Sequence, residues 1–184
     1  MTEFFLFSAW KKFQDARGRV SYEASGEGWH YLAIHEPTRA GLRIYTPGGP
    51  LASDEASLQS ALAHLVAYAK QQGAYVVRVE PDVKNTPLPS YLRKRGYRRA
   101  HKDINPAHTI LNDVAQSIED IDAGASSTVR NIWRKNIKEG VTFSVSYDPS
   151  SIELFIEMIH DVSKRTSMQP HPDSYFRTLA TSLF

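Results

Sequence analysis

The sequence predicts a mixed α/β (α+β) fold, and two observations carry that prediction. Residues 42–45 alternate in the manner of a strand, residues 75–79 are typical of a buried strand, and a helical pattern lies between them. Two alternating segments, Arg19 to Ala24 and Tyr31 to His35, come earlier and are joined by a glycine-containing turn. A mixed sheet with helices packed on it accommodates both the hairpin and the strand–helix–strand unit.

The helix of this unit is expected to run from Ser53 or Asp54 to about Gln72. Either of the first two residues can act as the N-cap, and Gly73 stands where glycine commonly ends a helix. Its apolar residues recur at helical spacings, so we expect this face to pack on the sheet. The residues are Leu58, Ala61, Leu62, Leu65 and Ala69.

The other elements of the first half are shorter. Phe4 to Gln14 predicts a helix, and the prolines and glycines of residues 46–50 require a loop. Pro87 and Pro89 interrupt the chain before a short basic helix near Tyr91 to Arg95.

A boundary is expected near Pro106, which gives domains of residues 1–106 and 107–184. The second domain is expected to contain strands at 109–111 and 141–147, and helices at 127–139, after Ser150 or Ser151, and from about Pro172. The last helix carries its apolar residues to Phe184 without a closing strand. We expect it to dock on the first domain or on a second copy, or to be completed by further elements.

The composition narrows the functional classes. The absence of cysteine excludes disulfides, thiol catalysis and thiolate metal sites. No apolar stretch approaches the roughly 20 residues of a membrane span, and the first ten residues lack the features of a signal peptide. We therefore expect a cytoplasmic protein.

The net charge of +2 conceals a basic segment. Residues 84–102 contain seven of the 22 Lys and Arg residues and no acid, which leaves 15 bases against 20 acids elsewhere. Such a patch indicates a polyanionic partner, or else a solvated helix and turn that keep the protein soluble. The candidate contacts are Arg93, Arg95, Arg98 and Arg99.

Common catalytic motifs are absent: the sequence has no GxxxxGK[ST], GxGxxG, HExxH or GxSxG. The seven histidines lack metal-ligand spacing, so neither a metal nor a cofactor is expected. In the helix at 127–139, Arg130, Arg134 and Lys138 recur every four residues beside an apolar stripe that includes Trp133. This face could hold phosphate groups, or it could be the solvated side of an amphipathic helix.

Several segments match, in the same order, the motifs of one enzyme family. Leu6-Phe7-Ser8-Ala9-Trp10 is similar to the opening FLQSxxW, residues 45–50 resemble Y-A-P-x-G-P, and residues 73–81 resemble a strand ending in an acidic residue and proline. Gly96-Tyr97 matches a common GF or GY, and residues 130–141 are similar to R-x-x-I-R-K-A-x-K-x-G-V. Lys164-Arg165 and Ser174-Tyr175-Phe176 resemble the KR and YF that follow. In this order, the segments resemble FemABX-type aminoacyltransferases of peptidoglycan synthesis.

The resemblance implies two GNAT-like acyltransferase folds, of which this chain holds the first and the beginning of the second. It implies aminoacyl-tRNA as donor and a peptidoglycan precursor as acceptor, either lipid II or UDP-MurNAc-pentapeptide, with the protein peripheral to the inner membrane face at most. An amine of the acceptor's stem peptide would attack the aminoacyl ester. The arginines at 93–99 would contact tRNA.

The resemblance also implies roles for individual residues. Glu80 is the candidate catalytic residue, and Tyr75 and Tyr175 fall where the family lines the acceptor cleft. The alternatives are an acidic strand end, a half-buried strand tyrosine and a core aromatic.

Two departures from the family concern the binding of a diphosphate. Gln14, with Lys11 and Lys12 nearby, stands where nucleotide-using members carry a lysine, and His171 stands where they carry an arginine. Lys12 and His171 join Tyr75 and Tyr175 as substrate-binding candidates. The loss of two fixed cations favours a different acceptor, such as lipid II.

Two other classes stay open. A coenzyme A N-acetyltransferase would need a pyrophosphate-binding loop of the pattern [RQ]xxGx[GA]. Residues 93–98 come nearest to this pattern, but Arg98 stands where it requires a small residue. A non-catalytic RNA-binding module, or an inactive truncated relative, would bind tRNA without transfer. We expect the isolated chain to transfer little or no amino acid, and to self-associate if its last helix stays exposed.

Overall fold

The computed structural model describes residues 8–81, 83, 87–105 and 112–183. Their contacts divide the chain into two units, Met1–His101 with Asp148–Phe184, and Lys102–Tyr147. The expected domains, 1–106 and 107–184, group the last helices differently. Those helices belong with the first unit because they pack against its N-terminal helix, as described below.

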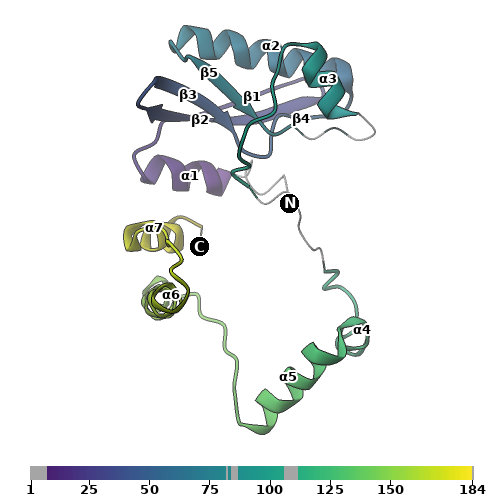
Figure 1. Cartoon of the computed structure of the whole chain (residues 1–184), viewed down its shortest axis with the longest axis vertical. Helices are drawn as coiled ribbons and strands as arrows, with labels where there is room; N and C mark the ends of the chain where they lie inside the picture. Colours follow the sequence, from purple (N-terminus) through teal and green to yellow (C-terminus); the bar gives the residue numbers. More distant parts are fainter. Residues whose placement is uncertain (1–7, 82, 84–86, 106–111, 184) are drawn as a thin grey trace. The chain divides into compact units, whose positions relative to one another are not determined.

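A mixed five-stranded sheet forms the first unit (Figure 1). β1 (Ser21–Gly26), β2 (Trp29–Thr38) and β3 (Gly41–Thr46) are antiparallel neighbours, and β5 (Val76–Val79) pairs in parallel with β3. The short β4 (Leu51–Ala52), which the sequence pattern does not predict, pairs with β2. The described chain is thus mixed α/β, with seven helices and these five strands, which confirms the predicted class.

Helix α2 (Glu55–Gln71) connects β4 to β5 and covers one face of the sheet. Asp54 is its N-cap, because its carboxylate accepts a hydrogen bond from the Ser57 amide at 2.8 Å. Gly73 follows the helix with φ +68°, a conformation that glycine adopts without strain. All five residues predicted for the apolar face are buried, so the predicted orientation of this helix is confirmed.

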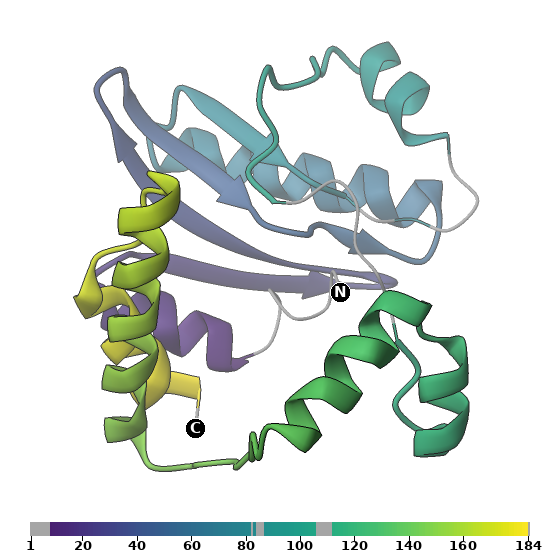
Figure 2. The same ribbon diagram turned by 60° about the horizontal axis from the view of Figure 1, so that its bottom comes forward.

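Helix α1 (Ser8–Ala16) lies on the opposite face of the sheet (Figures 1 and 2). Trp10 packs against Leu32 and Ile34 of β2, and Phe13 and Gln14 are buried. The predicted helix began at Phe4, which lies outside the described residues. The sheet is therefore covered on both faces by helices.

The C-terminal helices complete the first unit. A short 3-10 turn, η2 (Pro149–Ser151), leads into α6 (Ile152–Thr166), and α7 (Asp173–Leu183) follows. Tyr175 of α7 meets Phe13 of α1 edge-on at 5.1 Å between ring centroids, and Arg17 lies over the Tyr175 ring at 4.7 Å. Docking on the first unit was one of the outcomes expected for the last helix.

The remaining helix of the first unit, α3 (Leu88–Lys94), is the predicted basic helix. It is fastened to α2 because the Tyr91 hydroxyl donates a hydrogen bond to the Glu55 carbonyl at 3.0 Å. Tyr91 is buried against Leu58 and Leu62. Its neighbours in the chain carry the basic side chains to the surface.

The second unit contains α4 (Ile118–Gly124) and α5 (Ser127–Lys138), and none of its described residues is buried. The strand predicted for Val141 to Tyr147 is wrong. This segment pairs with no described strand, and Phe143 is 68% exposed. Alternating apolar residues favour a strand only where another strand supplies the hydrogen bonds. The strand predicted at 109–111 lies outside the described residues.

None of the described helices is long and apolar enough to cross a membrane.

Candidate functional site

A buried loop follows β3 at the end of the sheet where the parallel strands β3 and β5 terminate. Residues 46–50 are all buried, and the Thr46 hydroxyl is within 3.0 Å of the Gly49 carbonyl oxygen and 3.3 Å of that of Arg78. Gly48 has φ +59°, which favours glycine at this position. Ligands of α/β proteins commonly bind beyond the carboxyl ends of parallel strands, so this edge of the sheet is the candidate site.

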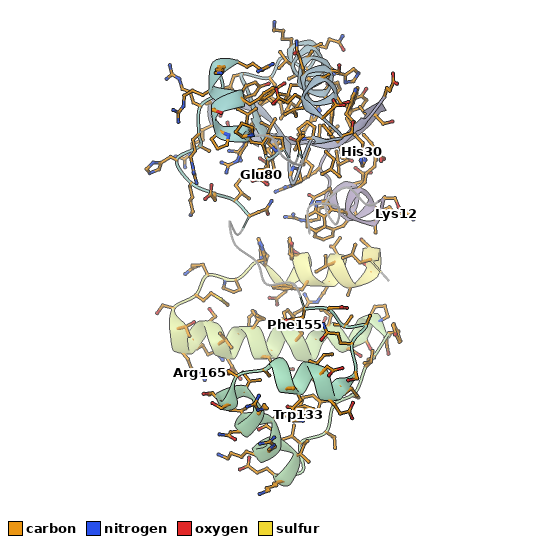
Figure 3. The ribbon with its side chains drawn as sticks, turned by 90° about the vertical axis from the view of Figure 1, so that its right-hand side faces the viewer. Lys12, His30, Glu80, Trp133, Phe155 and Arg165 are labelled. Carbon is orange, nitrogen blue, oxygen red and sulfur yellow. The ribbon has the colours of Figure 1, made fainter. Side chains whose placement is uncertain are left out.

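Glu80 comes immediately after β5 and is joined to this loop by its backbone and its side chain. Its amide donates to the Gly49 carbonyl at 2.8 Å, and its carboxylate accepts from the Gly48 amide at 3.2 Å. Figure 3 labels Glu80 in the sheet layer of the first unit. The loop therefore holds the carboxylate in a defined position at the candidate edge.

Tyr45, the penultimate residue of β3, is the second partner of the Glu80 carboxylate. Burial raises the pKa of the Tyr45 hydroxyl well above its usual range, and the charge of Glu80 and a hydrogen bond to it raise the pKa further. A neutral hydroxyl beside a carboxylate donates the hydrogen bond. Tyr45 therefore acts as a hydrogen-bond donor to the Glu80 carboxylate.

Arg78 adds a positive charge to this group. It is the register partner of Tyr45 in the parallel pair, and its guanidinium lies 5.9 Å from the Tyr45 ring centroid. Side chains of register partners point to the same face, and so do those of residues two apart, which places Arg78, Tyr45 and Glu80 on one face. A guanidinium, a hydroxyl and a carboxylate therefore lie together at this edge of the sheet.

The same face carries an ion-paired group on β2 and β3. Glu36 and Arg43 are register partners, and the Arg43 guanidinium lies 2.6 Å from the Glu36 carboxylate. Arg19 lies 3.5 Å from the other oxygen of that carboxylate. Most of the Glu36 side chain is shielded from solvent, so the two arginines neutralise a charge that would otherwise be costly to bury.

Tyr75 lies at the other end of β5. Its amide donates to the Leu42 carbonyl at 3.0 Å, its hydroxyl is 3.3 Å from the Thr38 hydroxyl, and the residue is 54% exposed. At about 3.3 Å per residue, five residues of extended chain separate it from Glu80 by about 16 Å. The structure does not bring these two predicted residues together.

Tyr175 and His171 lie together at the contact between α7 and α1. Their rings are stacked with centroids 4.0 Å apart, and Arg17 covers the Tyr175 ring. Burial and the nearby charge of Arg19 lower the pKa of Arg17. Lys12 lies on the same α1 helix but is exposed, and Figure 3 shows it well away from Glu80. Lys12, Tyr175 and His171 therefore form a group around α1.

The four predicted tRNA contacts differ in their surroundings. Arg95 is held in place, because its guanidinium stacks 3.6 Å from the Tyr91 ring centroid and lies 3.4 Å from the Gln59 side-chain oxygen. Arg93, Arg98 and Arg99 are all exposed. In the described part of the chain, no ion pair to Arg93 or Arg98 is seen.

The cationic row of α5 is partly occupied within the second unit. One nitrogen of Arg130 donates to carbonyls at the end of α4, the shortest of these bonds being 2.6 Å to Ala125, and Arg134 lies 3.8 Å from Asp122. Arg130 therefore caps a helix, which is a structural role. At Arg130, the structure favours the second of the two predictions for this helix face, the solvated side of an amphipathic helix.

The sequence pattern assigns no site role to Tyr45, Gly48 or Arg78, which the structure places beside Glu80. Tyr45 and Gly48 belong to the Tyr45–Pro50 loop motif, and Arg78 lies two residues before Glu80, but only the register of β3 and β5 brings the four together. Within the described ranges, no group of three or more His, Asp or Glu side chains could hold a metal ion. Comparisons with protein-family models, with curated proteins and with solved structures gave no match.

Proposed function

We propose that this chain carries an aminoacyltransferase site of the FemABX kind on a GNAT-like fold. It would move an amino acid from aminoacyl-tRNA to the stem peptide of a peptidoglycan precursor. The supporting observation is the Glu80 carboxylate, which the Gly48 amide and the Tyr45 hydroxyl hold at the carboxyl ends of the parallel strands. A carboxylate held in a defined position can act as the proton acceptor for a substrate amine.

The transfer itself requires little from the protein beyond alignment and one proton acceptor. The amine nitrogen of the acceptor forms a bond to the ester carbonyl carbon, and the bond from that carbon to the ribose oxygen breaks. The amine loses a proton, and the departing ribose oxygen gains one. Glu80 would accept the proton from the amine and return it to the ribose oxygen, and Arg78 would stabilise negative charge on the carbonyl oxygen.

The donor would be held by the basic surface around α3. Arg93 and Arg98 are exposed, and Arg95 presents a guanidinium already oriented by Tyr91. Cations that contact phosphates release condensed counterions, so affinity for tRNA should fall steeply with salt. Binding through this surface requires no base-specific contact.

The acceptor would contact the group around α1. Lys12 is exposed, and the stacked pair of His171 and Tyr175 offers a planar surface beside Arg17. Because Tyr75 lies about 16 Å along the strand from Glu80, it would contact a part of the acceptor remote from the reacting amine. Lipid II remains the favoured acceptor, since the family's two diphosphate-binding cations have no equivalents here.

The first experiment measures tRNA binding across a salt titration. We expect the triple variant Arg93→Gln, Arg98→Gln, Arg99→Gln to bind more weakly, with the slope of log K against log[salt] reduced by about 2 to 3. The matched control removes the same charge elsewhere, with Arg39→Gln, Lys164→Gln and Arg165→Gln, and should leave the slope unchanged. Equal behaviour of the two variants would refute a donor site at α3.

The second experiment measures transfer from aminoacyl-tRNA to lipid II by mass spectrometry. We expect any activity of the parent to fall by about 10²- to 10⁴-fold in Glu80→Gln, as for the loss of a general base. Glu27→Gln, at an exposed glutamate in the turn between β1 and β2, is the control and should retain activity. Equal turnover by Glu80→Gln and the parent would refute the proposed role of Glu80.

A further inference from the structure

A shallow groove lies on the outer side of α2, next to the end of α3. Its volume is about 490 Å³, and it is open to solvent. Leu62, Ala63, Val66 and Tyr97 contribute to its lining, and Lys70 and Arg95 provide cations within it. The groove is therefore apolar at its floor and positive at its rim.

The basic character extends beyond the groove. Residues 84–102 contain no acid, and α2 has a single acidic residue, Glu55, one turn before the groove begins at Gln59. The surface thus favours an occupant that combines aliphatic side chains with negative charge.

The second unit contains a segment of the complementary kind. Residues 112–125 carry four acids, including Glu119 and Asp122, and no Lys or Arg. On α4, Ile118 is 80% exposed and Ile121 is 41% exposed, three residues further along the helix. An acidic helix that leaves its aliphatic side chains in solvent needs a partner to cover them.

We propose that α4 of a second copy of this chain occupies the groove on α2 and α3, with the reciprocal contact closing a two-fold dimer. Ile118 and Ile121 would contact the groove floor, and Glu119 and Asp122 would face Lys70 and Arg95. The helix fits within the groove, because the groove runs for about 16 Å from Gln59 to Lys70 and a seven-residue helix measures only about 10 Å. Reciprocal docking uses the same two patches on each copy, so the assembly stops at a dimer.

This inference goes beyond the proposed function and does not depend on it, since neither patch includes Glu80 and the test uses no RNA. It does have a consequence for the donor site. A docked α4 would cover Arg95, so the dimer and tRNA would compete for that side chain.

The test exploits the two different patches in one chain. A groove variant, Lys70→Glu with Arg95→Glu, and a helix variant, Glu119→Lys with Asp122→Lys, are each examined by sedimentation velocity. Each variant alone should be monomeric, because both of its contacts then oppose like charges. Mixed in equal amounts they should form dimers, since every groove in the mixed dimer meets a helix of opposite charge.

Additional variants guard against local unfolding. Arg95 stacks on Tyr91, so Lys70→Glu paired with Glu119→Lys repeats the test without altering that contact. Ile118→Ser should weaken dimerisation about tenfold or more, because it removes an isoleucine that becomes buried only in the dimer. The control is Leu154→Ser, a change at a leucine of α6 that is 65% exposed.

Two results would overturn the proposal. One is a parent chain that stays monomeric at its highest soluble concentration. The other is a mixture of the charge-reversed variants that associates no better than either variant by itself, which would show that any dimer forms through another surface.

Discussion

Removing the Tyr45 hydroxyl tests the hydrogen bond that positions the Glu80 carboxylate. Tyr45→Phe keeps a ring that is only 5% exposed and deletes the donor to Glu80. A hydrogen bond to a charged group contributes about 1.5 to 3 kcal/mol. Glu80 is half-buried and keeps the Gly48 amide, so we expect a loss near the lower end, about 1.5 kcal/mol.

The chain provides a closely matched control in Tyr91. It is also 5% exposed, and its hydroxyl donates to a neutral acceptor, the Glu55 carbonyl, at 3.0 Å. Tyr91→Phe should therefore cost about 0.5 to 1.5 kcal/mol, the range for a bond between neutral groups. The measurement is urea unfolding at pH 7, followed by circular dichroism, with the free energy of unfolding obtained by linear extrapolation.

A double-mutant cycle with Glu80→Gln isolates the pairwise contribution. We expect Tyr45→Phe to cost clearly less in the Glu80→Gln background, because the amide no longer presents a charge to the hydroxyl. Tyr91→Phe should cost the same in both backgrounds. Additive losses for Tyr45 and Glu80 would refute the hydrogen bond, and with it the view that Tyr45 holds the carboxylate in position.

Three further predictions concern the fold. Leu62→Ala should lower the free energy of unfolding by about 2 to 5 kcal/mol, since Leu62 is 4% exposed; an unchanged urea midpoint would show that the buried face of α2 is misassigned. Burial lowers the pKa of His35 below its ordinary 6.5, so the folded state binds fewer protons than the unfolded state. The stability that His35 contributes is therefore present above pH 6.5 and is lost as the pH falls towards the pKa of the folded state. His35→Gln should reduce this pH dependence in urea unfolding measured between pH 7 and pH 5. Tyr175→Ala should release α7 from Phe13 and speed amide hydrogen exchange in α7; unchanged exchange would contradict docking through this side chain.

The sequence by itself determined the elements whose signals are local. The five apolar positions of α2, its Asp54 cap and the glycine after it are sufficient to define the helix and its buried face, because helical periodicity and capping act within a few residues. Strands β1 to β3 and β5 were predicted for the same reason. The failure at Val141 to Tyr147 shows the limit, since an alternating segment forms a strand only where a partner strand is present.

The tertiary structure decided which of these residues meet. The predicted strand at 75–79 already separates Tyr75 from Glu80, but Tyr45 approaches Glu80 only because β3 and β5 pair in parallel with a particular register. Tyr175 likewise meets Phe13 and Arg17 only because α7 packs on α1. Such contacts join residues far apart in the chain, and their geometry depends on strand register and helix docking, which no local pattern specifies.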